Sequence, residues 1–260
     1  MEALSPYQVA ALRMLSAGLV LIPFALEGFR QIPKHKLLLV IVSGLIGSFF
    51  PAFLFCIAET KIDSALAGIL NALTPLFTIM VGISFFQLNA SRPKIIGVLV
   101  GFLGLCLLFL AQNHLSFENV SYAGLVLIAT LLYGININLV GQHLHHIGSL
   151  NIASVAFAFL IIPCIIILYI TGYFSLPLFS KPILHASGAA FLLGVGGTAV
   201  ATVFYYMLVK RAGGLFASTV TYGIPFVAVF WGVLGGETIN FLQGCCMVII
   251  LVGVYLANKK

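Results

Sequence analysis

The sequence predicts an all-α polytopic membrane protein built as an inverted repeat of two helix bundles, with about nine transmembrane helices. Three observations lead to this fold class. The chain is 62% hydrophobic and only 7% charged, so it cannot cover a water-soluble globule with polar side chains. Its apolar residues fall into runs of membrane-spanning length. One pattern of small residues around a mid-helix proline also occurs twice along the chain.

The apolar runs locate the expected helices, because roughly 20 residues of helix cross the hydrocarbon core of a bilayer. The connecting loops are short, and none is long enough for a soluble domain. Gly97, Gly101 and Gly104 share one face of the fourth run, which predicts close packing against another helix. We expect helices at about 6–27, 37–57, 64–86, 94–111, 121–141, 150–171, 183–209, 214–234 and 241–257.

The third and eighth runs carry the repeated pattern. Pro75 interrupts SALAGILNALTPLFTIMVGISFF, and Pro225 interrupts GLFASTVTYGIPFVAVFWGVLGG 150 positions later. Proline has no amide hydrogen, so the carbonyls of Asn71 and Thr221 lose their usual helical partners. An unsatisfied carbonyl is costly in lipid, and both breaks are therefore expected to face protein or a polar cavity.

The same offset holds without a gap from Gly44, which matches Gly194, to Gln87, which matches Glu237. Lysine and arginine gather in alternate loops and at the C-terminus, which predicts a cytoplasmic C-terminus and an outer N-terminus. The two proline helices are five apart in the predicted order. Because that separation is odd, the copies cross the bilayer in opposite directions, and the repeat is inverted.

The order of motifs resembles the EamA domain of the drug/metabolite transporter superfamily. The second copy, 121–257, contains LYG, then FYYMLVKRAGGLFASTVTYGIPFVAVFWGVLGGE, then a closing helix over Cys246–Ala257. The first copy, 1–111, contains LSPYQVAALRM, AETKIDSALAGILNALTPLFTIMVG and IIGVLVGFLGLCLLF. The resemblance covers nearly the whole chain. It implies EamA-type bundles and a secondary transporter.

Two departures from the family pattern stand out. Gln87 takes the place that Glu237 has in the second copy. The family typically has five helices in each repeat, whereas the first copy here has four, as if the first helix were missing. Either the assigned start codon lies too far downstream, or the protein has nine helices in all.

Polar and aromatic residues at membrane depth are the candidate substrate contacts, because the resemblance implies that their helices face a central cavity. Amides, hydroxyls and aromatic rings suit a small uncharged or zwitterionic solute. The alternative for any one residue is structural: Asn71 or Thr221 could satisfy a carbonyl freed by proline. The candidates are Phe50, Phe53, Asn71, Thr74, Tyr133, Asn136, Thr198, Thr202, Tyr205, Thr221 and Tyr222, with Pro75 and Pro225 as helix breaks.

Charged residues and histidines narrow the chemistry. Arg13 is the one charge clearly inside a span, where it could neutralise a substrate carboxylate, pair with a protein group or extend to the outer interface. The six acidic residues lie at helix ends or in loops, so an enzyme is not expected, and no carboxylate for ion coupling stands out. His143, His145 and His146 share one loop, which leaves a metal exporter as a less favoured alternative, although no metal site or cofactor is expected.

Together these features predict an exporter of a small organic metabolite that works by alternating access between inverted repeats. The alternative is a non-transporting membrane protein, such as an assembly subunit or a membrane enzyme. The expected partners are the lipid bilayer and an amino-acid-like or other small polar solute, with a homodimer as an open option. The loops account for the net charge of +6, so no nucleic acid is expected. We expect a multi-pass protein of the cell membrane, in a bacterial inner membrane.

Overall fold

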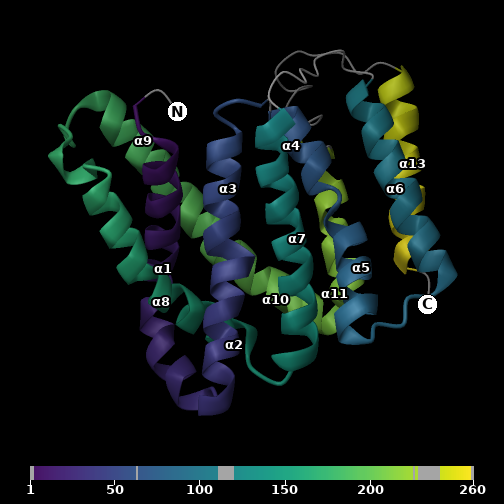
Figure 1. Ribbon diagram of the computed structural model, residues 1–260, viewed down its shortest axis with the longest axis horizontal. Coiled ribbons are helices and arrows are strands. Elements are labelled where there is room, and N and C mark those ends of the chain that lie inside the picture. The colour runs from purple at the N-terminus through teal and green to yellow at the C-terminus, as the bar shows by residue number, and fades with distance from the viewer. Residues whose placement is uncertain (1–2, 63, 111–119, 225, 228–240, 259–260) are drawn as a thin grey trace. The chain divides into compact units, whose positions relative to one another are not determined.

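The computed structural model describes residues 3–62, 64–110, 120–224, 226–227 and 241–258 (Figure 1). Within these residues every regular element is a helix, which confirms the all-helical fold class. A shorter apolar helix covers Phe241–Ala257. Among the described residues, six segments are long and apolar enough to cross a bilayer: Pro6–Gln31, Lys34–Ala58, Leu66–Phe86, Ser121–His143, Ser149–Ile170 and Lys181–Ala212.

The helices begin and end within about one turn of the predicted bounds. The part of the helix expected at 214–234 that follows Val227 lies outside the described residues. The first part of the chain forms α1 (Pro6–Gln31), α2 (Lys34–Gly44), η1 (Leu45–Phe49), α3 (Phe50–Ala58), α4 (Ser64–Asn71), α5 (Thr74–Phe86) and α6 (Arg92–Leu110). The second part forms α7 (Val120–His143), α8 (Ser149–Ile170), η2 (Tyr173–Ser175), α9 (Lys181–Leu192), η3 (Leu193–Val200), α10 (Ala201–Ala212), α11 (Gly214–Ser218), η4 (Thr219–Gly223) and α13 (Phe241–Asn258).

Local chemistry fixes the start of α1. The Ser5 hydroxyl accepts a hydrogen bond from the Gln8 amide at 3.3 Å, and the Gln8 side chain accepts one from the Ser5 amide at 2.9 Å. This capping box satisfies two amides that the first turn leaves without helical partners, and Pro6 at the helix start needs none. Gln8 also donates to the Thr171 carbonyl at 2.9 Å, which ties the start of α1 to the end of α8.

Two long spans widen into π-helical turns at matching places. One π-turn is η1, and the other is η3, which contains the residues 150 positions further along the chain. Gly44, just before η1, matches Gly194 in sequence, and Ser48 and Thr198 match within the turns. A π-turn is an uncommon departure from α geometry. Its presence at corresponding places extends the sequence repeat to the backbone.

Contacts divide the chain into two compact units. Unit 1 comprises Met1–Thr60 and Leu139–Arg211, and unit 2 comprises Lys61–Asn138 and Ala212–Lys260. Each unit therefore takes helices from both sequence copies, and neither copy is a compact body by itself.

In unit 1, α1 packs along α8 through two glycines. A Cβ added at Gly18 would lie 2.7 Å from a side-chain carbon of Ile161, and one added at Gly28 would lie 2.7 Å from a side-chain carbon of Val155. The partner residue moves back along α8 as the glycine moves forward along α1, so the two helices are antiparallel. At the far end of α1, Asn151 donates a hydrogen bond to Gln31 at 2.6 Å.

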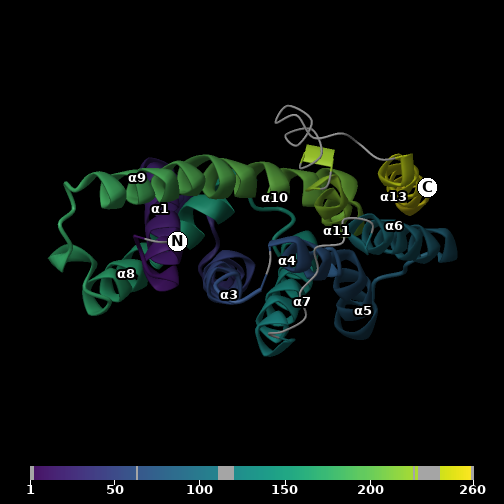
Figure 2. The ribbon, with the colours of Figure 1, turned by 90° about the horizontal axis from the view of Figure 1, so that it is seen from above.

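In unit 2, α6 and α13 form a second antiparallel pair, and Figure 1 and Figure 2 both show them side by side. A Cβ at Gly97 would fall 2.2 Å from the backbone nitrogen of Ala257, and one at Gly253 would fall 2.3 Å from that of Gly101. A Cβ added at Gly104 would likewise lie 3.0 Å from the backbone nitrogen of Ile250. The predicted close packing of the glycine face is confirmed, and α13 is its partner.

These two pairs join corresponding helices of the repeat. α6 is the last helix of the first copy, and α13 is the last helix of the second. α1 and α8 each lie two predicted spans before the proline helix of their own copy. Corresponding helices that run in opposite directions are what an inverted repeat requires. The antiparallel pairs therefore agree with the relation inferred from the loops.

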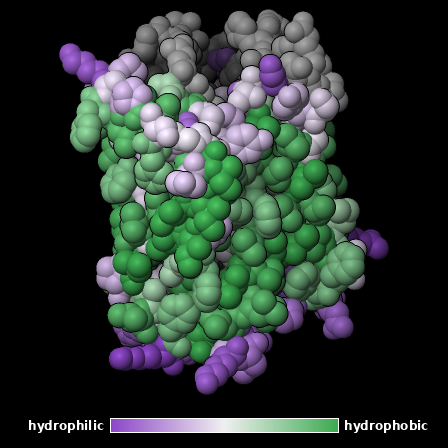
Figure 3. Space-filling view, turned by 60° about the vertical axis from the view of Figure 1, so that its left-hand side comes forward, coloured by the Kyte–Doolittle hydropathy of each residue, from purple (hydrophilic) through white to green (hydrophobic). Residues whose placement is uncertain are grey.

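Large apolar side chains cover much of the described surface. Leu26, Phe85 and Ile170 are 74%, 81% and 75% exposed. Figure 3 shows one face on which apolar residues form a broad band, with hydrophilic residues gathered at its lower end. Such a surface is suited to lipid rather than to water.

We predict that Gly253→Ala destabilises the protein by about 1–3 kcal/mol, because a methyl group there would overlap the backbone of α6. The loss is measured as a lower midpoint of thermal unfolding for the purified protein in detergent.

Gly244→Ala is the matched control, since it lies in the same helix and a Cβ there meets nothing within 4 Å. Alanine favours helix over glycine, so this variant should be unchanged or slightly more stable. Equal losses of stability at the two positions would contradict the close packing of α6 on α13 at Gly253.

Candidate functional site

The first helix break lies in unit 2, where α4 ends at Asn71 and α5 begins at Thr74. Pro75 occupies the first turn of α5, and it leaves the Asn71 carbonyl without an amide donor. The Thr74 hydroxyl donates to that carbonyl at 2.6 Å. It also lies 3.3 Å from the Asn71 side-chain oxygen. The carbonyl freed by proline is therefore satisfied by the residue just before the proline.

At the second break, also in unit 2, a backbone amide supplies the donor to the freed carbonyl. The chain tightens from α11 into the 3₁₀-helix η4, and the Ile224 amide donates to the Thr221 carbonyl. Pro225 itself lies outside the described residues. The Thr221 hydroxyl donates to the Ser218 carbonyl at 3.0 Å, and Thr219 and Ser218 make similar bonds three residues back. These hydroxyls supplement the hydrogen bonding of an unwound segment.

Helix α7 is fastened to α5 beside the first break. Asn138, which is 6% exposed, donates to the Thr78 carbonyl at 2.9 Å and to the Gly134 carbonyl at 2.9 Å. A Cβ at Gly134 would lie 3.0 Å from the backbone of Thr78, and one at Gly82 would lie 2.8 Å from the Asn138 side-chain oxygen. Asn138 was visible in the sequence as a polar residue in LYGININ, but its partner 60 residues away was not.

Tyr222 and Gly101 form the contact between η4 and α6. The tyrosine has no exposed surface, and its hydroxyl donates to the Val98 carbonyl at 2.9 Å. A Cβ at Gly101 would fall 2.6 Å from the tyrosine ring. Tyr222 thus packs the second break against α6.

In unit 1, Arg13 meets Thr198 at the π-turn of η3. The Nε of Arg13 donates to the Thr198 hydroxyl oxygen at 2.7 Å, across 185 positions of sequence. The Thr198 hydroxyl itself donates a hydrogen bond to the Leu193 carbonyl at 3.4 Å. Gly194 lets the two backbones touch, because a Cβ there would lie 2.4 Å from the Arg13 carbonyl oxygen. Of the roles expected for Arg13, pairing with a protein group is the one observed.

Glu59, just after α3, interacts electrostatically with the positive charge of Arg13. Burial raises the pKa of the Glu59 carboxyl above its ordinary value, and the positive charge of Arg13 opposes that rise. The Glu59 carboxyl and the Thr198 hydroxyl therefore both act on the Arg13 guanidinium.

The aromatic candidates of α3 follow η1 in unit 1. Phe53 is 9% exposed and its ring centroid lies 4.8 Å from that of Phe49, whereas Phe50 is 46% exposed. In α10, Thr202 and Tyr205 are half-buried and continue along the chain from Thr198 at helical spacing.

The sequence candidates thus fall in both units. Tyr133 is half-buried in α7, and Asn136 is 4% exposed. Unit 2 contains Asn71, Thr74, Tyr133, Asn136, Thr221 and Tyr222. Unit 1 contains Phe50, Phe53, Thr198, Thr202 and Tyr205.

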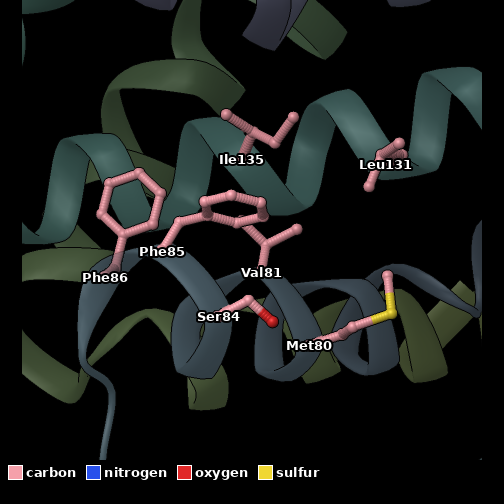
Figure 4. Close-up of a pocket in the computed structure, with 7 residues that line it drawn as sticks. All are labelled: Met80, Val81, Ser84, Phe85, Phe86, Leu131 and Ile135. Carbon is pink, nitrogen blue, oxygen red and sulfur yellow. The ribbon is translucent and has the colours of Figure 1, made fainter.

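A groove of about 540 Å³ also lies between α5 and α7 (Figure 4). None of the sequence candidates lines it, and Ser84 is the one polar residue among those that do. Apolar walls of this kind suit a lipid chain better than a polar solute. The groove is lined by Met80, Val81, Ser84, Phe85 and Phe86 of α5 and by Leu131 and Ile135 of α7.

Metal ligands do not gather in the part of the chain that the structure describes: no three residues of the types His, Cys, Asp and Glu are placed to hold one ion there. His145 and His146 stack edge to face with ring centroids 5.2 Å apart, and both are exposed.

Comparison with known proteins finds one family along nearly the whole chain. Residues 1–110 and 120–259 each match the EamA-like transporter family. The uncharacterised inner membrane transporter YedA of Escherichia coli K12 is 25% identical over 261 residues, which cover 99% of this chain and 83% of that protein. An uncharacterised transporter of Archaeoglobus fulgidus is 23% identical over 262 residues, covering 99% and 90%.

A solved structure titled "Crystal structure of protein" has the same fold. Its TM-score is 0.73 at 20% sequence identity, and the match covers 98% of this chain and 88% of that one.

Thr74→Val tests the first helix break, because valine keeps the shape of threonine and removes only the donor to the Asn71 carbonyl. We expect a loss of about 1–3 kcal/mol in stability, the usual cost of a buried polar group left without its partner. Thermal unfolding in detergent measures it, and Thr74→Ser should restore most of the loss.

Thr60→Val is the matched control. Its hydroxyl makes the same bond three residues back, to the Ile57 carbonyl at 2.7 Å, but the residue is exposed. Its removal should cost much less, since water can replace the donor. A loss as large as that of Thr74→Val would argue against a special role for the break.

Proposed function

Because the chain belongs to the EamA-like transporter family, we propose that this membrane transporter is an exporter of a small organic metabolite, an amino-acid-like or other small polar solute. In this proposal it is a secondary transporter that works by alternating access between two inverted repeats. Its relatives in Escherichia coli and Archaeoglobus fulgidus are named as transporters, and we propose no enzymatic reaction.

The observation that carries the proposal is the pair of interrupted helices in unit 2. A backbone that leaves α-helical geometry at membrane depth is tolerated where protein or a water-lined cavity surrounds it. Transporters with inverted repeats use such discontinuous helices to hold their substrates. The breaks at Asn71–Thr74 and at Thr219–Gly223 are discontinuities of this kind.

The proposal assigns different roles to the candidate residues. The hydroxyls of Thr74, Thr198, Thr221 and Tyr222 are bonded to protein groups, and we assign them the task of supporting the helix breaks and the π-turn. We propose direct contact with the solute for the other polar and aromatic candidates, because of their side-chain chemistry and their place within the predicted spans. In unit 2 these are Asn71, Tyr133 and Asn136, and in unit 1 they are Phe50, Phe53, Thr202 and Tyr205.

We further propose a cytoplasmic C-terminus, because Lys and Arg concentrate in alternate loops and at that end of the chain. The relation to an inner membrane transporter supports a multi-pass protein of the cell membrane.

Purified protein in liposomes should carry at least one solute from a panel of amino acids and related metabolites with saturable kinetics. Tyr133→Phe and Asn71→Leu should lower flux by about tenfold, because each removes a hydrogen-bonding group assigned to the solute. The measurement is the initial rate of radiolabelled solute uptake.

Tyr255→Phe provides a matched control for Tyr133→Phe, since Tyr255 is 69% exposed on α13 in the same unit. Its flux should equal that of the unaltered protein. Full flux in both test variants would refute the assignment of substrate contacts, and no saturable flux of any solute would refute the transporter proposal.

Single cysteines at Lys61 and Arg211 test the inverted topology, because these residues match at the offset of 150. In a protein whose five native cysteines have been replaced, a membrane-impermeant thiol reagent added to intact cells should label position 61 and leave position 211 unlabelled. Labelling of both positions from the same side would rule out the antiparallel arrangement of the copies.

A further inference from the structure

We propose that Arg13 forms an anion-binding site in unit 1, in which the terminal nitrogens of its guanidinium bind one oxyanion of a small molecule. The chemistry is that of a carboxylate or phosphate group, from either a solute or a lipid headgroup. If the anion is a solute, the inference deepens the proposed function and rests on it, because it adds an acidic group to the description of the substrate.

A charged side chain such as that of Arg13 is energetically unfavourable inside a membrane-spanning helix unless it has a polar or charged partner. It lies in the third turn of α1, a helix long and apolar enough to cross a bilayer. Ionised side chains within such helices are rare, and they face the protein interior or a water-filled space. Arg13 is half-buried, so one side of it is in contact with protein and another is not.

The guanidinium retains unused donors. Among the described residues its side chain makes one hydrogen bond, from Nε to the Thr198 hydroxyl. A guanidinium carries five N–H donors, so the four on its two terminal nitrogens remain. No buried side-chain nitrogen or oxygen in the described residues lacks a hydrogen-bond partner. The terminal nitrogens are therefore accessible rather than sealed in the protein.

The site is held in place before any ligand arrives. Thr198 fixes the Nε edge of the guanidinium at 2.7 Å, and the Gly194 backbone lies directly against the Arg13 carbonyl. The remaining edge presents parallel N–H groups, whose geometry matches the two oxygens of a carboxylate or phosphate. A preorganised donor pair of this kind binds an anion without first ordering a flexible side chain.

Glu59 carries an opposing charge that acts on Arg13. The two groups act on each other electrostatically, yet no ion pair within 4.0 Å joins them in the described part of the chain. The Glu59 carboxylate repels another anion electrostatically, so it lowers the affinity of the site, but it does not occupy the terminal nitrogens of Arg13. Removal of the Glu59 charge should therefore strengthen anion binding.

Paired ligands that differ only in charge provide the test: benzoate against benzamide and acetate against acetamide, at constant ionic strength. The readout is the stabilisation of the purified protein against thermal unfolding as the concentration of each probe rises, which gives an apparent dissociation constant. The unaltered protein should bind each acid about tenfold more tightly than its amide, because hydrogen bonds to a charged group are the stronger ones.

Arg13→Met should abolish the preference for the acids, and Arg13→Lys should retain part of it as a point charge. Arg30→Met is the matched control, since Arg30 is exposed at the other end of α1, and it should bind like the unaltered protein. Thr198→Val should weaken binding several-fold, whereas Glu59→Gln should strengthen it several-fold. These two variants keep the test decisive if Arg13→Met does not fold.

A second arm identifies the source of the anion. Delipidated protein is titrated with phosphatidylglycerol and, separately, with phosphatidylcholine. Stabilisation by phosphatidylglycerol that requires Arg13, together with weak binding of benzoate, would assign the site to a lipid headgroup. Stabilisation by benzoate that requires Arg13 would assign it to a solute.

Equal binding of acid and amide by the unaltered protein, with no Arg13-dependent lipid effect, would overturn the proposal. Unchanged acid binding and an unchanged lipid effect in Arg13→Met would do the same. These binding results are independent of flux in liposomes, so a failure of the transporter proposal and a failure of the anion site can be told apart.

Discussion

The fold depends on one constraint: inside a lipid bilayer the chain itself must supply a partner for nearly every backbone carbonyl. The two proline helices show two ways of meeting it. In the first copy a side chain does so, because Thr74 donates to the Asn71 carbonyl. In the second copy the chain tightens into a 3₁₀-turn, and the Ile224 amide reaches Thr221. Both helices are thus interrupted while the carbonyls of Asn71 and Thr221 keep a hydrogen-bond donor.

Close helix packing provides the rigid background for these interruptions. Hydrophobic burial gives little reason for helices to associate in lipid, so van der Waals contact between small residues carries more of the association. Gly97, Gly101 and Gly253 bring α6 and α13 into backbone contact, and Gly18 and Gly28 do the same for α1 and α8. In each unit close glycine contacts therefore join a helix of one copy to its counterpart in the other.

The sequence was sufficient for the helices and for the repeat, because membrane-spanning length and mid-helix prolines are local signals. It also predicted the glycine face of α6. It did not reveal that α13 packs on that face, or that Arg13 bonds to Thr198, because these partners lie far apart in the chain. Thr74 and Asn71 were both predicted as substrate contacts, with satisfaction of the freed carbonyl as the alternative role for Asn71. The structure shows Thr74 as the donor, a distinction that depends on side-chain orientation.

The matching π-turns carry information about how this chain arose. A π-turn closes its hydrogen bonds over one residue more than the α-helix around it, and such turns are rare. Two unrelated irregularities at matching positions of two copies would be a coincidence, whereas a shape that both copies inherited needs none. Over Leu45–Phe49 and the residues 150 positions later only Gly47 and Gly197 are identical, yet both stretches are π-helical. The backbone of the repeat is therefore kept here more closely than its side chains.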